Sequence, residues 1–204
     1  MRRWIAGMAL LIAAGAPAAA EARLLGDAAI AYSAERTVTV DGHSYTGMVF
    51  HIPGHDRHEQ AIAGMSEVIL LDAAQKEGFL LVPLLSVYVP FAFPELMAEL
   101  DAPDFRRHPV GHEAVNGLRT TKYRIDHTAA DGSRARGFAW VSAQGILMRL
   151  DGTVARHGYK PVTIRMELAN LALGPQDPAL FRLPAGLVRL PPDTLQRFFG
   201  GQTG

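Results

Sequence analysis

Histidine and carboxylate side chains are concentrated in one short segment of the first half of the chain. Residues 51–59 contain His51, His55, Asp56, His58 and Glu59. Imidazole nitrogen and carboxylate oxygen are ligands that zinc and copper accept, so one hypothesis is a metal centre in a metal-dependent enzyme. The spacing matches no closed metal site, however, and Pro53-Gly54 predicts a hairpin tip in the middle of the segment. We therefore favour a solvated polar turn whose side chains are splayed apart, with no stoichiometric metal.

Other catalytic motifs are missing from the sequence. The segment that starts at Gly64 resembles a Gly-x-Ser-x-Gly nucleophile motif but lacks its last glycine. Neither a Gly-x-Gly-x-x-Gly motif nor a phosphate-binding loop occurs. The chain has no cysteine, which excludes disulfides, thiolate metal sites and a cysteine nucleophile. These absences favour a protein that is not an enzyme and that carries no cofactor.

Alternating large side chains provide a candidate binding surface. Arg134, Arg136, Phe138 and Trp140 fall on one face of a single strand, because side chains alternate along a strand. This face is either the wall of an apolar cavity, with guanidinium groups at its rim, or an ordinary core face whose arginine stems reach solvent. The pattern by itself favours the core face, since apolar stripes are usually core. The methionines allow both readings, because methionine suits adaptable apolar surfaces and also fills gaps: Met48, Met97, Met148 and Met166.

Turn signals predict the sheet that positions these residues. Asn116-Gly117 lies between two β-type runs and is the preferred sequence of a type I′ hairpin turn, which needs positive φ at both residues. Asp131-Gly132 and Gln144-Gly145 extend residues 110–150 into an antiparallel meander. Further strands are predicted at residues 29–40, 44–52, 57–63, 67–71, 78–82 and 161–170.

One main helix is predicted among these strands. It spans residues 94–100 with Pro94 in its first turn, and Leu96, Met97 and Leu100 share one face of it. A single helical turn is predicted at residues 177–181. The sum is nine or ten antiparallel strands, mainly β, in a strongly curved open sheet closed by this helix.

The N-terminal segment has the layout of a secretory signal peptide. Two arginines precede an apolar run at residues 4–14, and small residues follow up to Ala22. Cleavage is expected near Ala20 or Ala22, leaving one domain at residues 23–204 in the periplasm. Removing residues 1–20 takes two arginines from 20 basic and 20 acidic residues, so the mature charge is 18 − 20 = −2. A near-neutral surface provides no electrostatic footprint for nucleic acid.

Three phrases in the second half resemble a known family. Residues 111–123 resemble G-x-E-x-V-N-G-x-x-x-x-K-Y, residues 137–149 resemble G-x-x-W-V-S-x-x-G-I-P-x-R, and residues 177–187 resemble D-x-x-L-F-x-L-P-x-G-Y. Together they are similar to the LolA-like superfamily of periplasmic lipoprotein carriers and, more closely, to its uncharacterised exported relatives. The chain departs from the pattern at Leu147, where relatives often have proline, and in having one clear lid helix.

The resemblance implies a half-barrel sheet closed by helices over an apolar cavity. It implies a non-catalytic carrier for a lipid or acyl group, with a membrane-bound protein as donor or acceptor. We predict that the ligand contacts Phe138, Trp140, Met148 and Met166 from the sheet and Phe91, Leu96, Met97 and Leu100 from the lid side. The alternative is a periplasmic protein-interaction or sensor domain on the same fold.

Overall fold

The computed structural model describes residues 28–62, 64–92, 106–129 and 132–192. Within them the strands are β1 (Tyr32–Val40), β2 (His43–Ile52), β3 (His55–Ile62), β4 (Met65–Asp72), β5 (Glu77–Val82), β6 (Val87–Ala92), β7 (Arg106–Val115), β8 (Leu118–Thr128), β9 (Arg134–Ser142), β10 (Leu147–Ala155), β11 (Val162–Leu173) and β12 (Val188–Arg189). Two 3₁₀ turns are present, η1 (Pro83–Leu85) and η2 (Pro178–Phe181).

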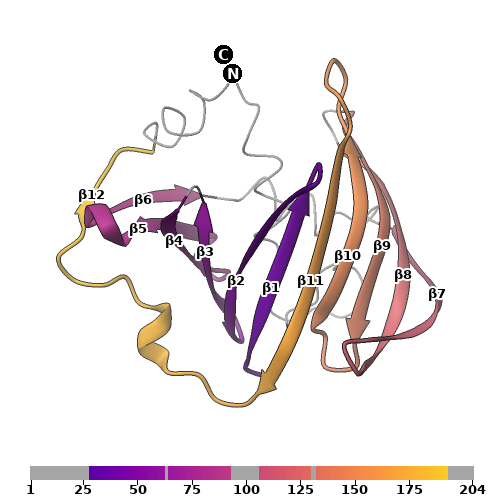
Figure 1. The fold of residues 1–204 in the computed structure, drawn as a ribbon, viewed down its shortest axis with the longest axis horizontal. Coiled ribbons are helices and arrows are strands. Elements are labelled where there is room, and N and C mark those ends of the chain that lie inside the picture. The colour runs from indigo at the N-terminus through magenta and orange to yellow at the C-terminus, as the bar shows by residue number, and fades with distance from the viewer. Residues whose placement is uncertain (1–27, 63, 93–105, 130–131, 193–204) are drawn as a thin grey trace.

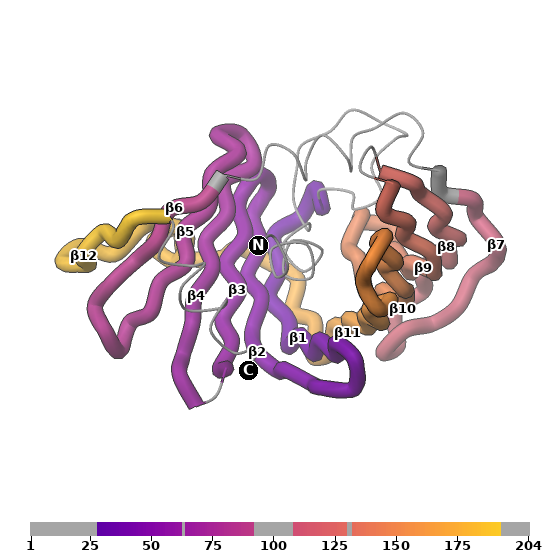
Figure 2. The backbone as a smooth tube through the Cα atoms, turned by 90° about the horizontal axis from the view of Figure 1, so that it is seen from above, coloured from indigo at the N-terminus to yellow at the C-terminus, as the bar shows by residue number. Residues whose placement is uncertain are grey.

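These strands form one open sheet. Its order is β12-β6-β5-β4-β3-β2-β1-β11-β10-β9-β8-β7, so β12 and β7 are the two edges and do not pair with each other. Neighbours are antiparallel except β12, which runs parallel to β6. The sheet bends so that β1–β6 form one wall and β7–β11 the other, and β1 pairs with β11 where the walls meet (Figures 1 and 2). The predicted mainly β, curved and open antiparallel sheet is confirmed.

The turn chemistry explains why the hairpins form where the sequence indicates. Asn116 and Gly117 have φ values of 47° and 79°, and Asp41 and Gly42 have 48° and 86°. Both pairs therefore adopt the left-handed conformation that a two-residue type I′ turn needs. The strand limits differ modestly from expectation. β1 begins at Tyr32, β10 runs on to Ala155 and β11 to Leu173.

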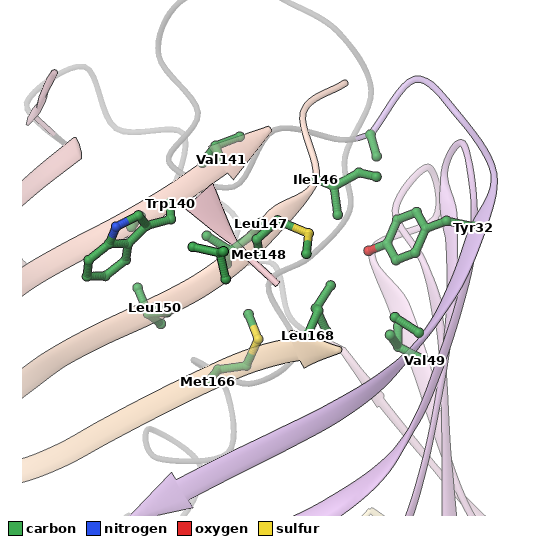
Figure 3. Packing of buried hydrophobic residues seen from close by; sticks show 14 of the residues in the cluster. Tyr32, Val49, Trp140, Val141, Ile146, Leu147, Met148, Leu150, Met166 and Leu168 are labelled. Carbon is green, nitrogen blue, oxygen red and sulfur yellow. The ribbon is translucent and has the colours of Figure 1, made fainter. Parts of the chain in front are cut away.

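The two faces of the sheet are set by register, because residues paired across neighbouring strands point to the same side. Val38 pairs with Met166 of β11, and Met166 pairs with Leu150 of β10. These side chains lie on the inside of the bend, which we call the concave face. Tyr32 and Val49 from one wall approach Leu168 and Met166 from the other there (Figure 3).

The opposite, convex face of β3–β6 is covered by the segment after β11. This strap contains η2 and β12 and passes along the outside of the sheet (Figure 1). Its Leu183 and Leu187 pack against Val68, Leu70 and Leu81. Arg57 Nη1 donates to the carbonyl oxygen of Leu180 at 3.0 Å, which ties the strap to β3.

The helical predictions have different outcomes. The turn at residues 177–181 is confirmed as η2, and Asp177 Oδ1 accepts a hydrogen bond from Ala179 N at 2.8 Å at its start. The helix predicted at residues 94–100 and the signal peptide predicted at residues 1–22 lie outside the described residues. Among the described residues, no helix has the length and apolar character needed to cross a membrane.

Candidate functional site

Apolar side chains from both walls form one continuous cluster. Its buried members include Val38. Figure 3 shows Val49 from one wall and Leu150, Met166 and Leu168 from the other. Met148 also belongs to this cluster and is 1% exposed. It lies at an irregularity in the β9–β10 register, between Leu147 and Arg149. Three of the predicted site residues, Trp140, Met148 and Met166, therefore belong to the same buried cluster.

Trp140 and Phe138 do not share the concave face with Met166. Met166 pairs with Leu150, and Leu150 pairs with Ala139, so these three side chains share the concave face. Phe138 and Trp140 flank Ala139 in β9, and because side chains alternate along a strand they point to the convex side. Trp140 pairs with Lys122 and Arg149, whose cationic groups lie 4.8 Å and 5.4 Å from a centroid of its ring. Trp140 and Met166 belong to the same buried cluster, but they lie on opposite faces of the sheet. The residues predicted to form one wall of a cavity therefore do not share one face.

Polar groups hold the Trp140 ring in place on the convex side. Its Nε1 donates to Glu113 Oε2 at 2.8 Å, and Lys122 Nζ donates to Glu113 Oε1 at 2.8 Å. Lys122 Nζ also lies 4.8 Å from the centroid of Phe138. These contacts hold the pKa of the Glu113 carboxyl below its ordinary value, mainly through the hydrogen bonds from Lys122 and Trp140. The arrangement explains the burial of the Trp140 ring and the partial burial of Phe138 without a ligand.

Phe91 of β6 lies on the concave face of the wall that β1–β6 form. It pairs with Gly78, and a Cβ on that glycine would come within 2.4 Å of the Phe91 ring, so the ring covers the glycine. Register continues this row through Leu71, Asp56 and His51 to Tyr32. The other residues predicted on the lid side, Leu96, Met97 and Leu100, lie outside the described residues.

The histidine segment is not the solvated turn that the sequence indicates. His51, Asp56 and His58 are each 1% exposed, so that prediction is wrong for these three residues. The reason is strand alternation on either side of Pro53-Gly54. His51 at the end of β2 pairs with Asp56 of β3, and both point to the concave face together with His58. His55 and Glu59 have the opposite parity and are only partly buried.

His51 and Asp56 form a hydrogen-bonded pair. His51 Nδ1 lies 2.8 Å from Asp56 Oδ1, and its Nε2 lies 2.8 Å from the carbonyl oxygen of Ala28. A carbonyl oxygen only accepts, so Nε2 donates to Ala28. Because the Nε2 proton is used in this bond, the short contact between Nδ1 and Asp56 Oδ1 needs a second proton, which the imidazole and the carboxylate share. The ring also stacks on Tyr32 with 5.0 Å between ring centroids.

Arg36 connects the first three strands. It pairs with Gly47, which pairs with Gln60, so the guanidinium crosses β2 where there is no side chain. Nη1 lies 2.8 Å from His58 Nδ1, and Nη2 donates to Gln60 Oε1 at 3.2 Å. Burial lowers the pKa of Arg36 to about 10, partly opposed by Asp56 and Tyr32. We call Arg36, His51, Asp56 and His58 the buried polar cluster.

Burial also determines the ionisation of the other members. The pKa of His58 is well below 6.5, because burial disfavours its charged form and Arg36 and His51 disfavour it further. Gln60 Nε2 lies 3.5 Å from Glu67 Oε2, and burial raises the pKa of that glutamate above 4.5. In the part of the chain that the structure describes, no group of three or more histidine, cysteine or acidic residues is arranged to hold a metal ion.

Sequence reasoning missed Arg36 as a site residue. A signal for it exists, because Arg36 alternates with Ala34 and Val38, both of which are fully buried on the apolar face of β1. A charge in the middle of such a stripe indicates a buried partner. The partner itself, His58, is 22 residues away and could be identified only from the pairing of β1, β2 and β3.

Comparison with solved structures identifies the class of fold. No protein-family model and no curated protein matches the chain. An uncharacterized conserved protein from Thermus thermophilus matches with a TM-score of 0.54 and 11% identity, over 80% of this chain and 91% of that chain. The fold is thus an open, curved sheet that solved proteins share.

Two further matches are to structures of named proteins. A chain in the MucA/MucB complex of Pseudomonas aeruginosa matches with a TM-score of 0.51 and 13% identity, over 77% of this chain and 56% of that chain. The present chain thus spans little more than half of its length. The LolA superfamily protein NE2245 from Nitrosomonas europaea matches with a TM-score of 0.41 and 8% identity, over 87% of this chain and 97% of that chain. The matches therefore include a member of the superfamily that the sequence motifs resemble.

Proposed function

We propose that the protein is an exported, non-catalytic binding protein that holds a lipid or acyl group against the concave face of its sheet. The observation that carries the proposal is the apolar cluster whose concave-face members, such as Val49 and Met166, come from both walls of the sheet. Met148 and Met166 belong to this cluster, and methionine repacks readily around variable apolar groups. Each methylene removed from water contributes about 0.8 kcal/mol, so affinity is expected to rise with chain length.

Export and partners complete the proposal. The charged, apolar and small-residue order of residues 1–22 supports cleavage near Ala20 or Ala22 and a periplasmic product. The carrier then receives its ligand from, or passes it to, a membrane-bound protein. N-terminal sequencing of the exported protein tests the location. An intact Met1 in a membrane fraction would contradict it.

Ligand binding is tested with the mature protein and fatty acids of increasing length. Isothermal calorimetry is expected to show saturable binding that tightens with each added methylene, and native mass spectrometry of protein from its own host should show co-purified lipid. Met166→Trp fills part of the concave face and should weaken binding. The matched control is Arg165→Trp, the adjacent residue on the convex face, whose side chain is 62% exposed. No saturable binding at any length would overturn the carrier proposal.

A protein-interaction or sensor domain is the second candidate. The edge strand β7 supports it, because residues 108–114 are exposed and β8 is the one described strand that pairs with β7. A strand from a partner can add to such an edge. The matched solved structures include one of MucB in complex with MucA(peri), which also supports a protein partner. A photo-crosslinker at His112, compared with one at Thr37 in the middle of the sheet, tests this candidate. A specific adduct at His112 is the expected result.

A further inference from the structure

His58 carries a buried hydrogen-bond donor for which the described residues provide no acceptor. An arginine guanidinium only donates hydrogen bonds, so the 2.8 Å contact between Arg36 Nη1 and His58 Nδ1 makes Nδ1 the acceptor. A neutral imidazole has one N–H, which must then be on Nε2. That atom is buried and makes no hydrogen bond to any residue in the described ranges.

The position of this donor is fixed from both sides. His58 pairs with Val49 of β2 and Ile69 of β4, both of which are buried. Their shared parity places the ring on the concave face, next to the apolar cluster that contains Val49. Nε2 is on the far side of the ring from Cβ, so the N–H extends away from the β3 backbone. Arg36 holds the opposite ring nitrogen and thereby sets the ring orientation.

The charges around the ring favour an oxygen atom as the missing acceptor. Arg36 on β1 and the His51–Asp56 pair on β2 and β3 lie near the ring, and Glu67 on β4 is reached through Gln60. The Arg36 guanidinium is a positive charge in direct contact with the ring, whereas His51 is paired with the Asp56 carboxylate. A positive potential beside a neutral N–H donor attracts a negatively charged or polarised oxygen. Native proteins rarely leave a buried donor without an acceptor, so such a group requires an explanation.

We propose that His58 Nε2–H donates a hydrogen bond to the carbonyl or carboxylate oxygen at the head of the bound acyl chain. This inference rests on the proposed function, which it deepens by naming the polar end of the ligand. The acyl chain contacts the apolar cluster, and its first carbon lies beside the buried polar cluster. The ring is 1% exposed, so the oxygen reaches it only when neighbouring apolar side chains move apart.

The test compares three probes of equal chain length on the full mature protein at pH 8. Dodecanoate carries a carboxylate, methyl dodecanoate carries an ester carbonyl, and dodecane carries no oxygen. We expect the wild type to bind the two oxygen-bearing probes about tenfold more tightly than dodecane, the effect of one net hydrogen bond. A further preference for dodecanoate over the ester identifies a carboxylate ligand, whereas equal affinity identifies a carbonyl.

Variants at position 58 connect this preference to the histidine. His58→Phe should reduce the preference for oxygen to less than about twofold, because the donor is lost. His58→Gln keeps an amide N–H within reach and should retain part of the preference. His55→Phe is the matched control on the convex side of the same strand and should bind like the wild type.

A direct readout does not depend on folding of the variants. In ¹⁵N-labelled wild type, the His58 ring should be the Nε2–H tautomer, and dodecanoate should shift its Nε2–H resonance strongly while dodecane does not. An unchanged resonance, a resonance already typical of a water-bonded N–H, or an intact oxygen preference in His58→Phe would each overturn the inference. If none of the three probes binds, the proposed function itself fails. Equal binding of all three defeats only the His58 assignment.

Discussion

Arg36 Nη1 and His58 Nδ1 lie 2.8 Å apart, although the two residues belong to strands that do not pair with each other. The guanidinium reaches β3 across β2 because Gly47 occupies the register position between them. The contact fixes which ring nitrogen carries the proton. It also places a guanidinium cation beside a fully buried histidine, with consequences for both stability and binding.

The first prediction concerns stability in mild acid. Burial and Arg36 hold the pKa of His58 well below 6.5 in the folded protein, whereas the unfolded chain takes up a proton near 6.5. The unfolded state therefore binds more protons as the pH falls below 6.5, and the free energy of unfolding decreases. We expect a loss of at most about 1.4 kcal/mol per pH unit from this residue. Urea denaturation between pH 7.5 and 5.5 measures it.

Glu67 acts in the opposite direction and must be separated from His58. Burial raises its pKa above 4.5, so the unfolded state releases this proton at a lower pH than the folded state. Its contribution to stability therefore increases as the pH falls toward 4.5. Measuring the slope in a Glu67→Gln background removes this effect. An unchanged slope after adding His58→Gln to that background would show that another group causes the acid sensitivity.

The second prediction concerns Gly47. A Cβ at this position would lie 1.8 Å from the carbonyl oxygen and 2.8 Å from the carbonyl carbon of Glu59. These are backbone atoms of the paired strand, so they cannot rotate away. We expect Gly47→Ala to lower the free energy of unfolding by about 3 kcal/mol, at the upper end of overpacking costs. The control is Gly78→Ala, where the obstacle is the Phe91 side chain. A cost at Gly47 no larger than at Gly78 would contradict the close approach of β2 and β3.

Local chemistry explains which elements could be predicted from the sequence. Asn116-Gly117 adopts the expected turn because the need for positive φ is met within two residues. Strand alternation likewise located most of the sheet. These signals require no knowledge of which strand lies beside which.

The faces of the strands could not be predicted in the same way. Phe138 and Trp140 look like core residues within β9, but Lys122 of β8 and Arg149 of β10 cover Trp140 on the convex side. The burial of His51 and His58 depends on Ala28, Asp56 and Arg36, whose positions follow from strand pairing. In β9 the long side chains of Lys122 and Arg149 thus cover an aromatic residue on the convex face. In β2 and β3, Arg36 and Asp56 allow two histidines to be buried on the concave face.

The third prediction concerns the strap on the convex face. Leu187 packs against the apolar outer sides of β4 and β5, whereas its neighbour Val188 is 60% exposed. We expect Leu187→Ala to lower the free energy of unfolding by about 2 kcal/mol, at the low end for a buried leucine because Leu187 is only partly buried. Val188→Ala should change it by less than about 0.5 kcal/mol. Thermal and urea denaturation provide the measurement, and equal effects of the two substitutions would contradict the packing of the strap.

The fourth prediction is that the purified protein contains no stoichiometric zinc or copper. Both ring nitrogens of His51 make hydrogen bonds, to Asp56 and to Ala28, and Arg36 occupies His58 Nδ1. A metal would have to displace these partners and lie beside the Arg36 cation. Elemental analysis of protein from its own host tests this. One equivalent of metal that disappears in His55→Ala would contradict it.

The fifth prediction uses Trp140, the one tryptophan that remains after removal of residues 1–20. Its ring is on the convex side, hydrogen-bonded to Glu113 and covered by Lys122, so a ligand on the concave face does not contact it. We expect saturating dodecanoate to leave the tryptophan emission maximum unchanged, while calorimetry on the same sample reports binding. Glu113→Gln weakens the charge-assisted hydrogen bond to Nε1 and should shift the emission without changing affinity. A saturable shift on adding dodecanoate, still present in Glu113→Gln, would instead place the ligand against Trp140 and return Phe138 and Trp140 to the binding wall.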